Sequence, residues 1–150
     1  MMSTVLGSCV AMCLFDLDNQ VGGMNHFLLA TSSEAKSDDL KYGVNAVELL
    51  INRLLQSGAE RSNFQAKIFG GARMTEHGND IGAGNAAFAK DFLEKEGIPC
   101  VASSLGGVQA RRIQFIPTSG AARQLQVSGI APEELPPVKQ SRPRPEITLF

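Results

Sequence analysis

Two short apolar segments, separated by a polar one, constrain the fold of this chain more than any other feature. Residues 10–15 form an unbroken apolar run, and residues 26–29 are nearly as apolar. The segment Asp16-Leu17-Asp18-Asn19-Gln20 between them has the composition of a turn. Apolar runs this short beside a turn are typical of strands that are buried in a core. The sequence therefore predicts a β-hairpin of two buried strands near the N-terminus.

This hairpin brings a cysteine and a histidine together. If the turn is centred between Leu17 and Asp18, Cys9 and His26 lie directly opposite each other. Directly opposed residues have Cβ atoms roughly 4.5–5.5 Å apart. At that distance an imidazole can take the proton of a thiol and leave a nucleophilic thiolate. A turn centred one residue later, or a bulge at Gly22-Gly23, would instead make the pair diagonal neighbours.

Residues before the cysteine supply further candidates for a site. Gly7 permits a close approach of the backbone, and the amides of Ser8 and Cys9 could point at a developing oxyanion. Along a continuous extended strand, residues six apart share a face, so Ser3 would face the same way as Cys9 and Thr4 would point away. We therefore expect Ser3 to orient the base. The alternatives are a cysteine that only fills the core and a serine without a role.

Composition narrows the class of protein. A chain of 150 residues suits one domain, and a net charge of −1 without a basic cluster argues against nucleic acid as a partner. No apolar run approaches the ~20 residues that span a bilayer, so no membrane insertion is expected. Three cysteines without a secretory signal favour a cytoplasmic protein with reduced thiols.

Metal and cofactor sites are weakly supported by the sequence. Cys9, Cys13 and His26 have suitable ligand chemistry for zinc, but the second ligand pair of a structural zinc site is missing. We expect Cys13 and Cys100 to lie in the core. Phosphate-binding and dinucleotide-binding patterns are also missing, so no metal and no cofactor are expected.

The rest of the chain alternates helices and strands. Ser37 is a suitable N-cap for the first helix, and Gly58 a suitable residue after its end. The pattern predicts helices over residues 38–57 and 85–96, strands over 64–69 and 98–102, and a second hairpin of residues 111–116 and 125–127. This order predicts an α+β sandwich of packed β-sheets flanked by helices.

Proline dominates the end of the chain. We expect a folded domain over residues 1–128 and a Pro-rich C-terminal tail over residues 129–150. The last four residues, Ile147-Thr148-Leu149-Phe150, are mostly apolar and could add a strand to this chain or to another.

Several short motifs, in order and at the right spacing, resemble one family. The chain resembles the CheD family of chemoreceptor glutamine deamidases of bacterial chemotaxis, over roughly residues 3 to 127. The motifs that carry this resemblance are Leu6-Gly7-Ser8-Cys9-Val10, Gly22-Gly23-Met24-Asn25-His26, Tyr42-Gly43, Phe69-Gly70-Gly71-Ala72, Ile81-Gly82 with Asn85, and Leu105-Gly106-Gly107 followed by Arg111-Arg112.

The resemblance implies a cysteine hydrolase with the fold of the catalytic domain of cytotoxic necrotizing factor. Its nucleophile and base correspond to Cys9 and His26. The threonine that the family has six residues before the cysteine corresponds to Ser3. The site would be supported by residues of the first two motifs: Gly7, Ser8, Gly22, Gly23 and Asn25.

The implied reaction is hydrolysis of glutamine side-chain amides on the cytoplasmic helices of methyl-accepting chemotaxis receptors. It proceeds through a thioester and needs no cofactor, and the same machinery would also cleave a glutamate methyl ester. The alternative from another class is a non-catalytic partner that regulates a CheC-type response-regulator phosphatase.

Overall fold

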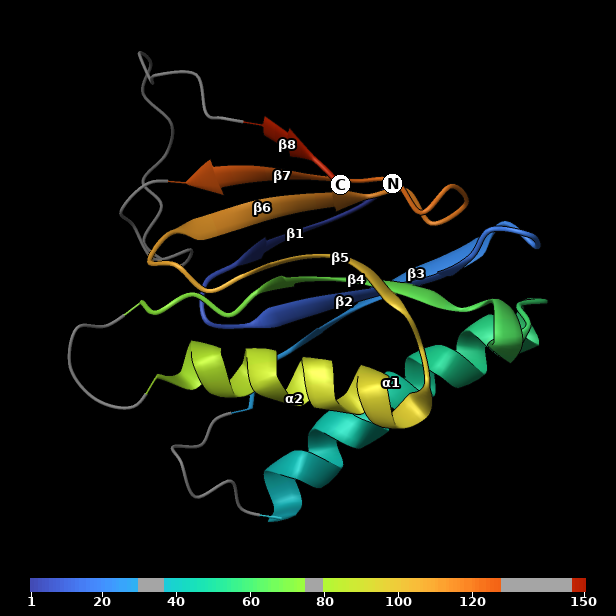
Figure 1. Cartoon of the computed structure of the whole chain (residues 1–150), viewed down its shortest axis with the longest axis horizontal. Helices are drawn as coiled ribbons and strands as arrows, with labels where there is room; N and C mark the ends of the chain where they lie inside the picture. Colours follow the sequence, from blue (N-terminus) through green and yellow to red (C-terminus); the bar gives the residue numbers. More distant parts are fainter. Residues whose placement is uncertain (30–36, 75–79, 128–146) are drawn as a thin grey trace.

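The computed structural model describes residues 1–29, 37–74, 80–127 and 147–150, and these form three layers (Figure 1). Helices α1 (Ser37–Gln56) and α2 (Ile81–Glu96) cover one face of a four-stranded sheet. The other face of this middle sheet packs against a second four-stranded sheet, which forms the outer layer. The α+β sandwich expected from the sequence is confirmed.

The two sheets differ in their connections. The outer sheet is antiparallel throughout, whereas β4 and β5 of the middle sheet run parallel. The middle sheet has the order β3-β2-β4-β5, with strands β3 (Val21–Phe27), β2 (Val10–Asp16), β4 (Gln65–Gly70) and β5 (Cys100–Leu105). The outer sheet has the order β1-β6-β7-β8, with strands β1 (Met2–Leu6), β6 (Ala110–Phe115), β7 (Ala122–Val127) and β8 (Ile147–Leu149). A short 3-10 helix, η1 (Arg61–Asn63), precedes β4.

Strand β2 explains the apolar run seen in the sequence. All of its residues are buried, because the helices lie on one side of it and the outer sheet on the other. Val10, Met12 and Leu14 belong to the core under the helices. The residues that alternate with them, such as Ala11 and Cys13, belong to the core between the sheets. The usual alternation of apolar and polar residues is absent because neither face of β2 reaches solvent.

The predicted hairpin is confirmed, but its register differs from the direct pairing expected. Ala11, not Cys9, is the partner of His26. The turn is centred one residue later than expected. The Asp16 carboxylate closes it by accepting hydrogen bonds from the backbone N–H of Asn19 at 3.1 Å and from the side-chain NH₂ of Asn19 at 2.7 Å. This makes Cys9 and His26 diagonal neighbours, the alternative left open by the sequence.

The buried carboxylate of Asp16 accepts further hydrogen bonds besides those from Asn19. It also accepts the backbone N–H of Glu60 at 2.8 Å and a side-chain N–H of Asn63 at 3.4 Å. Burial by itself raises the pKa of Asp16, but the hydrogen bonds from Asn19, Glu60 and Asn63 outweigh it and hold the pKa at about 2. The turn of the first hairpin is thereby tied to the segment that leads into β4.

Both α-helices lie close to where the sequence predicts them, but α2 begins earlier in the chain than expected. Helix α2 begins at Ile81 rather than Asn85, and the Asp80 side chain caps it by accepting the N–H of Ala83 at 2.9 Å. The glycines at positions 82 and 84 had indicated a loop in this segment. Gly82 nevertheless lies in the helix, and glycine is needed there because a Cβ would lie 2.3 Å from the carbonyl oxygen of Ala72.

The C-terminal residues extend the outer sheet of the same chain. Strand β8 pairs with β7, and the N–H of Phe150 donates to the carbonyl of Ala122 at 2.8 Å. The ring of Phe150 packs edge-on against Phe69 at 5.2 Å, and Lys67 donates to the carbonyl of Phe150 at 2.9 Å. Docking of the last residues on this chain is confirmed, whereas the expectation for the rest of the tail, residues 129–146, lies outside the described residues. In the described part, neither helix has the apolar length that crossing a bilayer requires.

Candidate active site at the edge between the two sheets

Cys9 lies in the segment where the chain passes from one sheet to the other. Strand β1 of the outer sheet ends at Leu6, and β2 of the middle sheet begins at Val10, so residues 7–9 form a connector. The side chain of Cys9 is half-buried and packs at the margin of the core between the sheets. Cys9 forms no disulfide. The thiol therefore sits at an edge of the sandwich rather than in its interior.

Backbone hydrogen bonds fix this connector from the side of β4. The N–H of Gly71 donates to the carbonyl of Cys9 at 2.8 Å, and the N–H of Ala72 donates to the carbonyl of Gly7 at 3.0 Å. Gly70 has a φ of 113°, and a Cβ there would lie 2.1 Å from the carbonyl oxygen of Cys9. Only glycine permits so close an approach, which explains the Gly70-Gly71 pair.

A buried asparagine holds the same connector from the side of α2. Asn85 has no solvent exposure, and its Nδ2 donates to the carbonyl of Ser8 at 2.9 Å. Its Oδ1 accepts the N–H of Leu29 at 2.8 Å. One side chain therefore links the residue before Cys9 to the chain just after His26. The sequence singled out Asn85 only as part of a motif and did not predict this role.

His26 faces the same layer as Cys9. Its partner Ala11 belongs to the core between the sheets, and directly paired residues lie on one face of a sheet. Cys9 lies just before β2, at the position that would be diagonal to His26 if the β2–β3 pairing continued by one residue, and residues at diagonal positions of a sheet are close enough for longer side chains to interact. Partial burial lowers the pKa of the His26 imidazole from its ordinary 6.5, although the residue remains open to solvent. A neutral ring is the form that can accept a proton.

Thr4, not Ser3, contacts the histidine. The Thr4 Oγ1 lies 3.1 Å from Nδ1 of His26, within hydrogen-bond distance. The expectation that Ser3 makes this contact is wrong, because it assumed one continuous strand from residue 3 to residue 9. The chain instead changes sheets after Leu6, which breaks the alternation of faces. Ser3 pairs with Gln114 and is exposed on the outer face.

Three of the expected supporting residues do not reach the site. Gly22 and Gly23 pair with the far end of β2, where added Cβ atoms would lie 2.4 Å from the carbonyl oxygen of Pro117 and 2.8 Å from a methyl group of Leu50. These glycines permit close packing of neighbouring elements. Asn25 lies on the opposite face of β3 from His26, because side chains alternate along a strand. Of the expected supports, Gly7 and Ser8 are the residues beside the nucleophile.

A further set of loop contacts steadies the glycine-rich rim of the site. The N–H of Gly106 donates to the carbonyl of Gly70 at 2.9 Å, and the N–H of Arg73 donates to the carbonyl of Gly107 at 2.8 Å. The buried guanidinium of Arg111 donates to the carbonyl of Gly106 and, at 2.7 Å, to that of Ser104. Burial lowers the pKa of Arg111 from its ordinary value. The Arg111 side chain thus anchors the turn between β5 and β6, and the N–H of Gly106 links this turn to β4.

The other two cysteines lack this environment. Cys13 is buried between the sheets, and desolvation raises its pKa to about 12 despite the nearby charge of Lys67. Cys100 was expected in the core but is exposed, because β5 is an edge strand of the middle sheet. Partial burial still raises the pKa of Cys100. Within residues 1–29, 37–74, 80–127 and 147–150, no group of His, Cys, Asp and Glu residues is arranged to hold a metal ion.

Comparison with known proteins shows the family of the chain. The family model described as "CheD chemotactic sensory transduction" matches residues 28–125. The chain is 46% identical over 159 residues to "Probable chemoreceptor glutamine deamidase CheD 1" of Ruegeria sp. (strain TM1040), covering 99% of this chain and 85% of that protein.

Two other relatives have matching names. The chain is 55% identical over 125 residues to "Probable chemoreceptor glutamine deamidase CheD" of Caulobacter vibrioides (strain NA1000 / CB15N), covering 82% of this chain and 67% of that protein. It is 48% identical over 158 residues to a protein of the same name from Rhizobium johnstonii, covering 99% and 86% respectively. By the extent of the family match and the identity to these relatives, the chain belongs to the CheD family.

Proposed function

We propose that this protein is a chemoreceptor glutamine deamidase, in which Cys9 is the nucleophile and His26 the general base. The observation that carries the proposal is the placement of both residues at the edge between the sheets, with the His26 ring held by Thr4. The names of the relatives supply the substrate class: glutamine side chains of chemoreceptors.

The first chemical step is formation of the thiolate. With Nδ1–H donated to the Thr4 hydroxyl, Nε2 of His26 carries the lone pair that takes the proton from Cys9. The lowered pKa of His26 keeps the ring neutral, and so able to accept this proton, at neutral pH. The thiolate then attacks the carboxamide carbon of a glutamine side chain, and the carbonyl oxygen becomes an oxyanion.

Backbone geometry supports an oxyanion site beside Cys9. In a trans peptide the C=O and the following N–H point in opposite directions, and the described residues contain no cis peptide bond. The carbonyl of Ser8 is turned toward Asn85, so the N–H of Cys9 points away from α2. In the same way the carbonyl of Gly7 is turned toward Ala72, so the N–H of Ser8 points away from the β4 segment. We assign these two amides to the oxyanion.

The remaining steps release the products. The C–N bond of the tetrahedral intermediate breaks, and protonated His26 gives its proton to the departing ammonia, which leaves a glutamyl thioester on Cys9. Neutral His26 then takes a proton from water, the hydroxide attacks the thioester, and the glutamate side chain leaves as the thiol is restored. The same sequence with methanol as leaving group would hydrolyse a glutamate methyl ester. The protein's own residues supply each proton transfer.

Two broader features belong to the same proposal. The fold of packed sheets flanked by helices is the architecture that we propose to share with the catalytic domain of cytotoxic necrotizing factor. The substrate is a cytoplasmic helix of a methyl-accepting chemotaxis receptor, which places the reaction in the cytoplasm. A site at the edge of the sandwich suits a side chain that projects from such a helix.

The test is deamidation of a purified cytoplasmic fragment of a chemoreceptor, followed by mass spectrometry of its glutamine-containing peptides. We expect conversion of specific glutamines to glutamate by the parent protein and by Cys100→Ala, and none by Cys9→Ala or His26→Ala. Unchanged turnover by Cys9→Ala would refute the mechanism. A non-catalytic regulator of a CheC-type phosphatase would deamidate nothing and would tolerate Cys9→Ala in every assay.

A further inference from the structure

The outer face of the β1-β6-β7-β8 sheet carries positive charge without compensation. Both helices pack against the middle sheet, so this face forms the opposite side of the molecule (Figure 1). The four strands contain three arginines and neither aspartate nor glutamate. The whole chain, in contrast, has 15 acidic and 14 basic residues. Charge is therefore segregated on this sheet.

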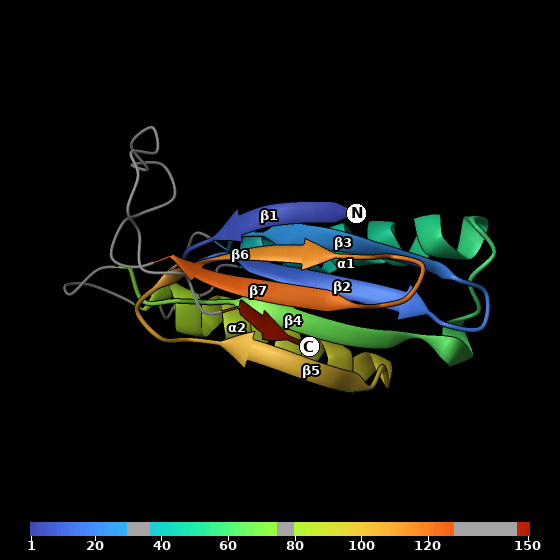
Figure 2. The same ribbon diagram turned by 90° about the horizontal axis from the view of Figure 1, so that it is seen from above.

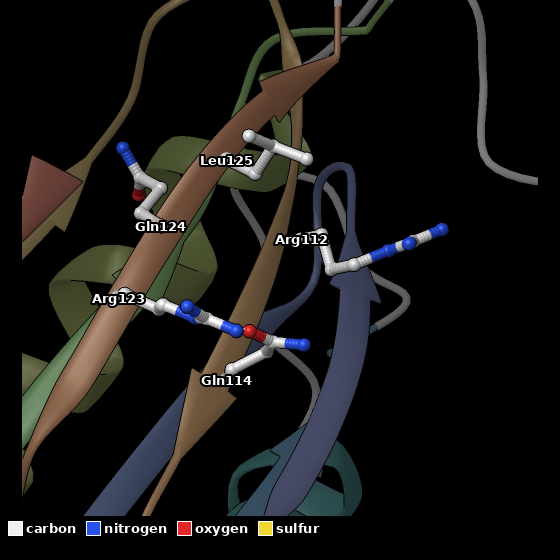
Figure 3. A pocket seen from close by; sticks show the side chains of 5 residues that line it. All are labelled: Arg112, Gln114, Arg123, Gln124 and Leu125. Carbon is white, nitrogen blue, oxygen red and sulfur yellow. The ribbon is translucent and has the colours of Figure 1, made fainter. Parts of the chain in front are cut away.

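Two of the arginines share the outward face. Arg112 pairs with Leu125 and Arg123 with Gln114, so the two arginines are diagonal neighbours on adjacent strands (Figure 3). Both are exposed, and neither forms an ion pair with a carboxylate in the part of the chain that the structure describes. The Arg123 guanidinium donates to the side chain of Gln114, which fixes its direction across the two strands.

The same face is hollowed and partly apolar. One hollow, of about 210 Å³, lies over β6 and β7 between the two arginines and is bordered by Leu125 (Figure 3). A second, of about 330 Å³, continues toward β8 and is bordered by Ile116 and Leu149. Both hollows are lined by Arg123 and Gln114, so they adjoin. Leu149 is 79% exposed and Ile116 43%, which leaves apolar surface beside the charges.

We propose that this face is a docking surface for an acidic amphipathic helix of the chemoreceptor substrate. Diagonal neighbours on a sheet lie roughly 7–8 Å apart, and carboxylates one helical turn apart have Cβ atoms about 5–6 Å apart. The long side chains of Arg112 and Arg123 can therefore each bind one carboxylate of such a pair. An apolar residue of the same helix would enter the hollow beside Leu125.

The inference rests on the proposed function and adds a second contact to it. Deamidation itself produces carboxylates, so a receptor helix that has been processed at one glutamine becomes a better ligand for these arginines. The surface and the site share strand β1: Arg112 pairs with Val5 on its outer face, and Thr4 on its inner face contacts His26 of β3, which lies at the same edge of the sandwich (Figure 2). Two arginines are too few to favour a membrane, because recognition of an anionic lipid surface takes a cluster of about four to eight basic residues.

The test is direct binding of a cytoplasmic receptor fragment to protein that carries Cys9→Ala, so that no turnover occurs during the measurement. The double reversal Arg112→Glu/Arg123→Glu is compared with Lys41→Glu/Arg53→Glu, which makes the same charge change on exposed positions of α1. We expect the first pair to weaken binding about tenfold at low salt, from two exposed charge pairs lost and reversed. The effect should shrink at high salt because exposed charges are screened.

Each outcome decides the proposal. An unchanged dissociation constant, an equal effect of the α1 pair, or no binding of the fragment at all would overturn the docking surface. If the variant Arg112→Glu/Arg123→Glu lost binding to vesicles of phosphatidylglycerol but still bound the receptor fragment, the arginines would be assigned to lipid instead. The proposed function fails separately, if the parent protein binds the fragment but leaves its glutamines intact. As a control, the double reversal is also made in a chain that retains Cys9. If its Cys9 reacts with iodoacetamide at the same rate as Cys9 of the parent protein, the site itself is unaltered.

Discussion

Replacing Asn85 by alanine should impair both stability and catalysis, because one side chain pairs a buried and a partly buried backbone group. The change leaves the N–H of Leu29 and the carbonyl of Ser8 without this partner. An unsatisfied buried group costs about 1–3 kcal/mol of unfolding free energy, which applies to the Leu29 N–H, and the partly buried Ser8 carbonyl adds less. The combined loss is a large share of the about 5–15 kcal/mol that stabilises a typical domain.

The effect of Asn85→Ala on kcat shows whether Asn85 positions the catalytic segment in addition to stabilising the fold. With Asn85 gone, the connector that carries Cys9 loses its link to α2, so the Ser8 and Cys9 amides are held less firmly in direction. We expect kcat to fall at least about tenfold, equivalent to about 1.4 kcal/mol in barrier. The KM for a receptor fragment should change little. Asn85→Asp retains an acceptor for the N–H of Leu29 but loses the donor to the carbonyl of Ser8 and buries a carboxylate, so it should impair kcat without restoring the stability.

The assays are urea unfolding for stability and steady-state deamidation at a temperature where each variant is folded. The rate of Cys9 alkylation by iodoacetamide reports the nucleophile directly. Asn45→Ala, at an exposed position on α1, is the matched control and should change stability by no more than about 0.5 kcal/mol. If Asn85→Ala is destabilised but keeps the parent kcat and alkylation rate, Asn85 supports the fold alone and the positioning argument is refuted.

Three further predictions follow from single contacts. Thr4→Ala should lower kcat/KM by roughly ten- to a hundredfold, about 1.4 to 2.7 kcal/mol in barrier. Ser3→Ala, on the outer face, should leave kcat/KM unchanged. The reverse pattern would contradict the hydrogen bond of Thr4 to His26. The acid limb of the kcat/KM profile should have an apparent pKa below 6.5, because the lowered pKa of His26 keeps the base active as pH falls; a limb at or above 6.5 would argue against His26 as the base. Asp16→Asn should destabilise the protein at neutral pH. In the parent, the contribution of Asp16 is fully present above its ordinary pKa of 3.8 and disappears as pH falls through about 2, so urea unfolding of the two proteins should converge over that window.

The elements of the fold could be predicted from local patterns because most of them carry strong local signals. The apolar run of β2 marks a strand, and α2 ends at Glu96 as predicted, followed by Gly97 with a φ of 67°. The start of α2 was misplaced because Gly82 and Gly84 weaken a helical pattern. Gly82 is required by its close approach to Ala72, which the sequence does not reveal, and so its low helix propensity was misread as a loop signal.

The residues proposed for the site could be singled out from the sequence, but their spatial arrangement could not. The pairing of a cysteine with a histidine across a hairpin could be read from residues 9 to 26. The hairpin register could not, because it depends on how the Asp16 carboxylate closes the turn. Nor could the choice of Thr4 over Ser3, which depends on the chain changing sheets after Leu6. Contacts between segments distant in sequence, such as Asn85 with Ser8, leave no periodic signal.

The most direct test of the central claim is to follow deamidating activity while Cys9 is alkylated. Samples taken during reaction with iodoacetamide are assayed on a receptor fragment, and peptide mapping gives the labelled fraction of Cys9, Cys13 and Cys100. If Cys9 is the nucleophile, residual activity falls in proportion to the labelling of Cys9 and is independent of label on Cys100. Activity that persists when Cys9 is fully labelled, or that falls with Cys100 instead, would contradict the account.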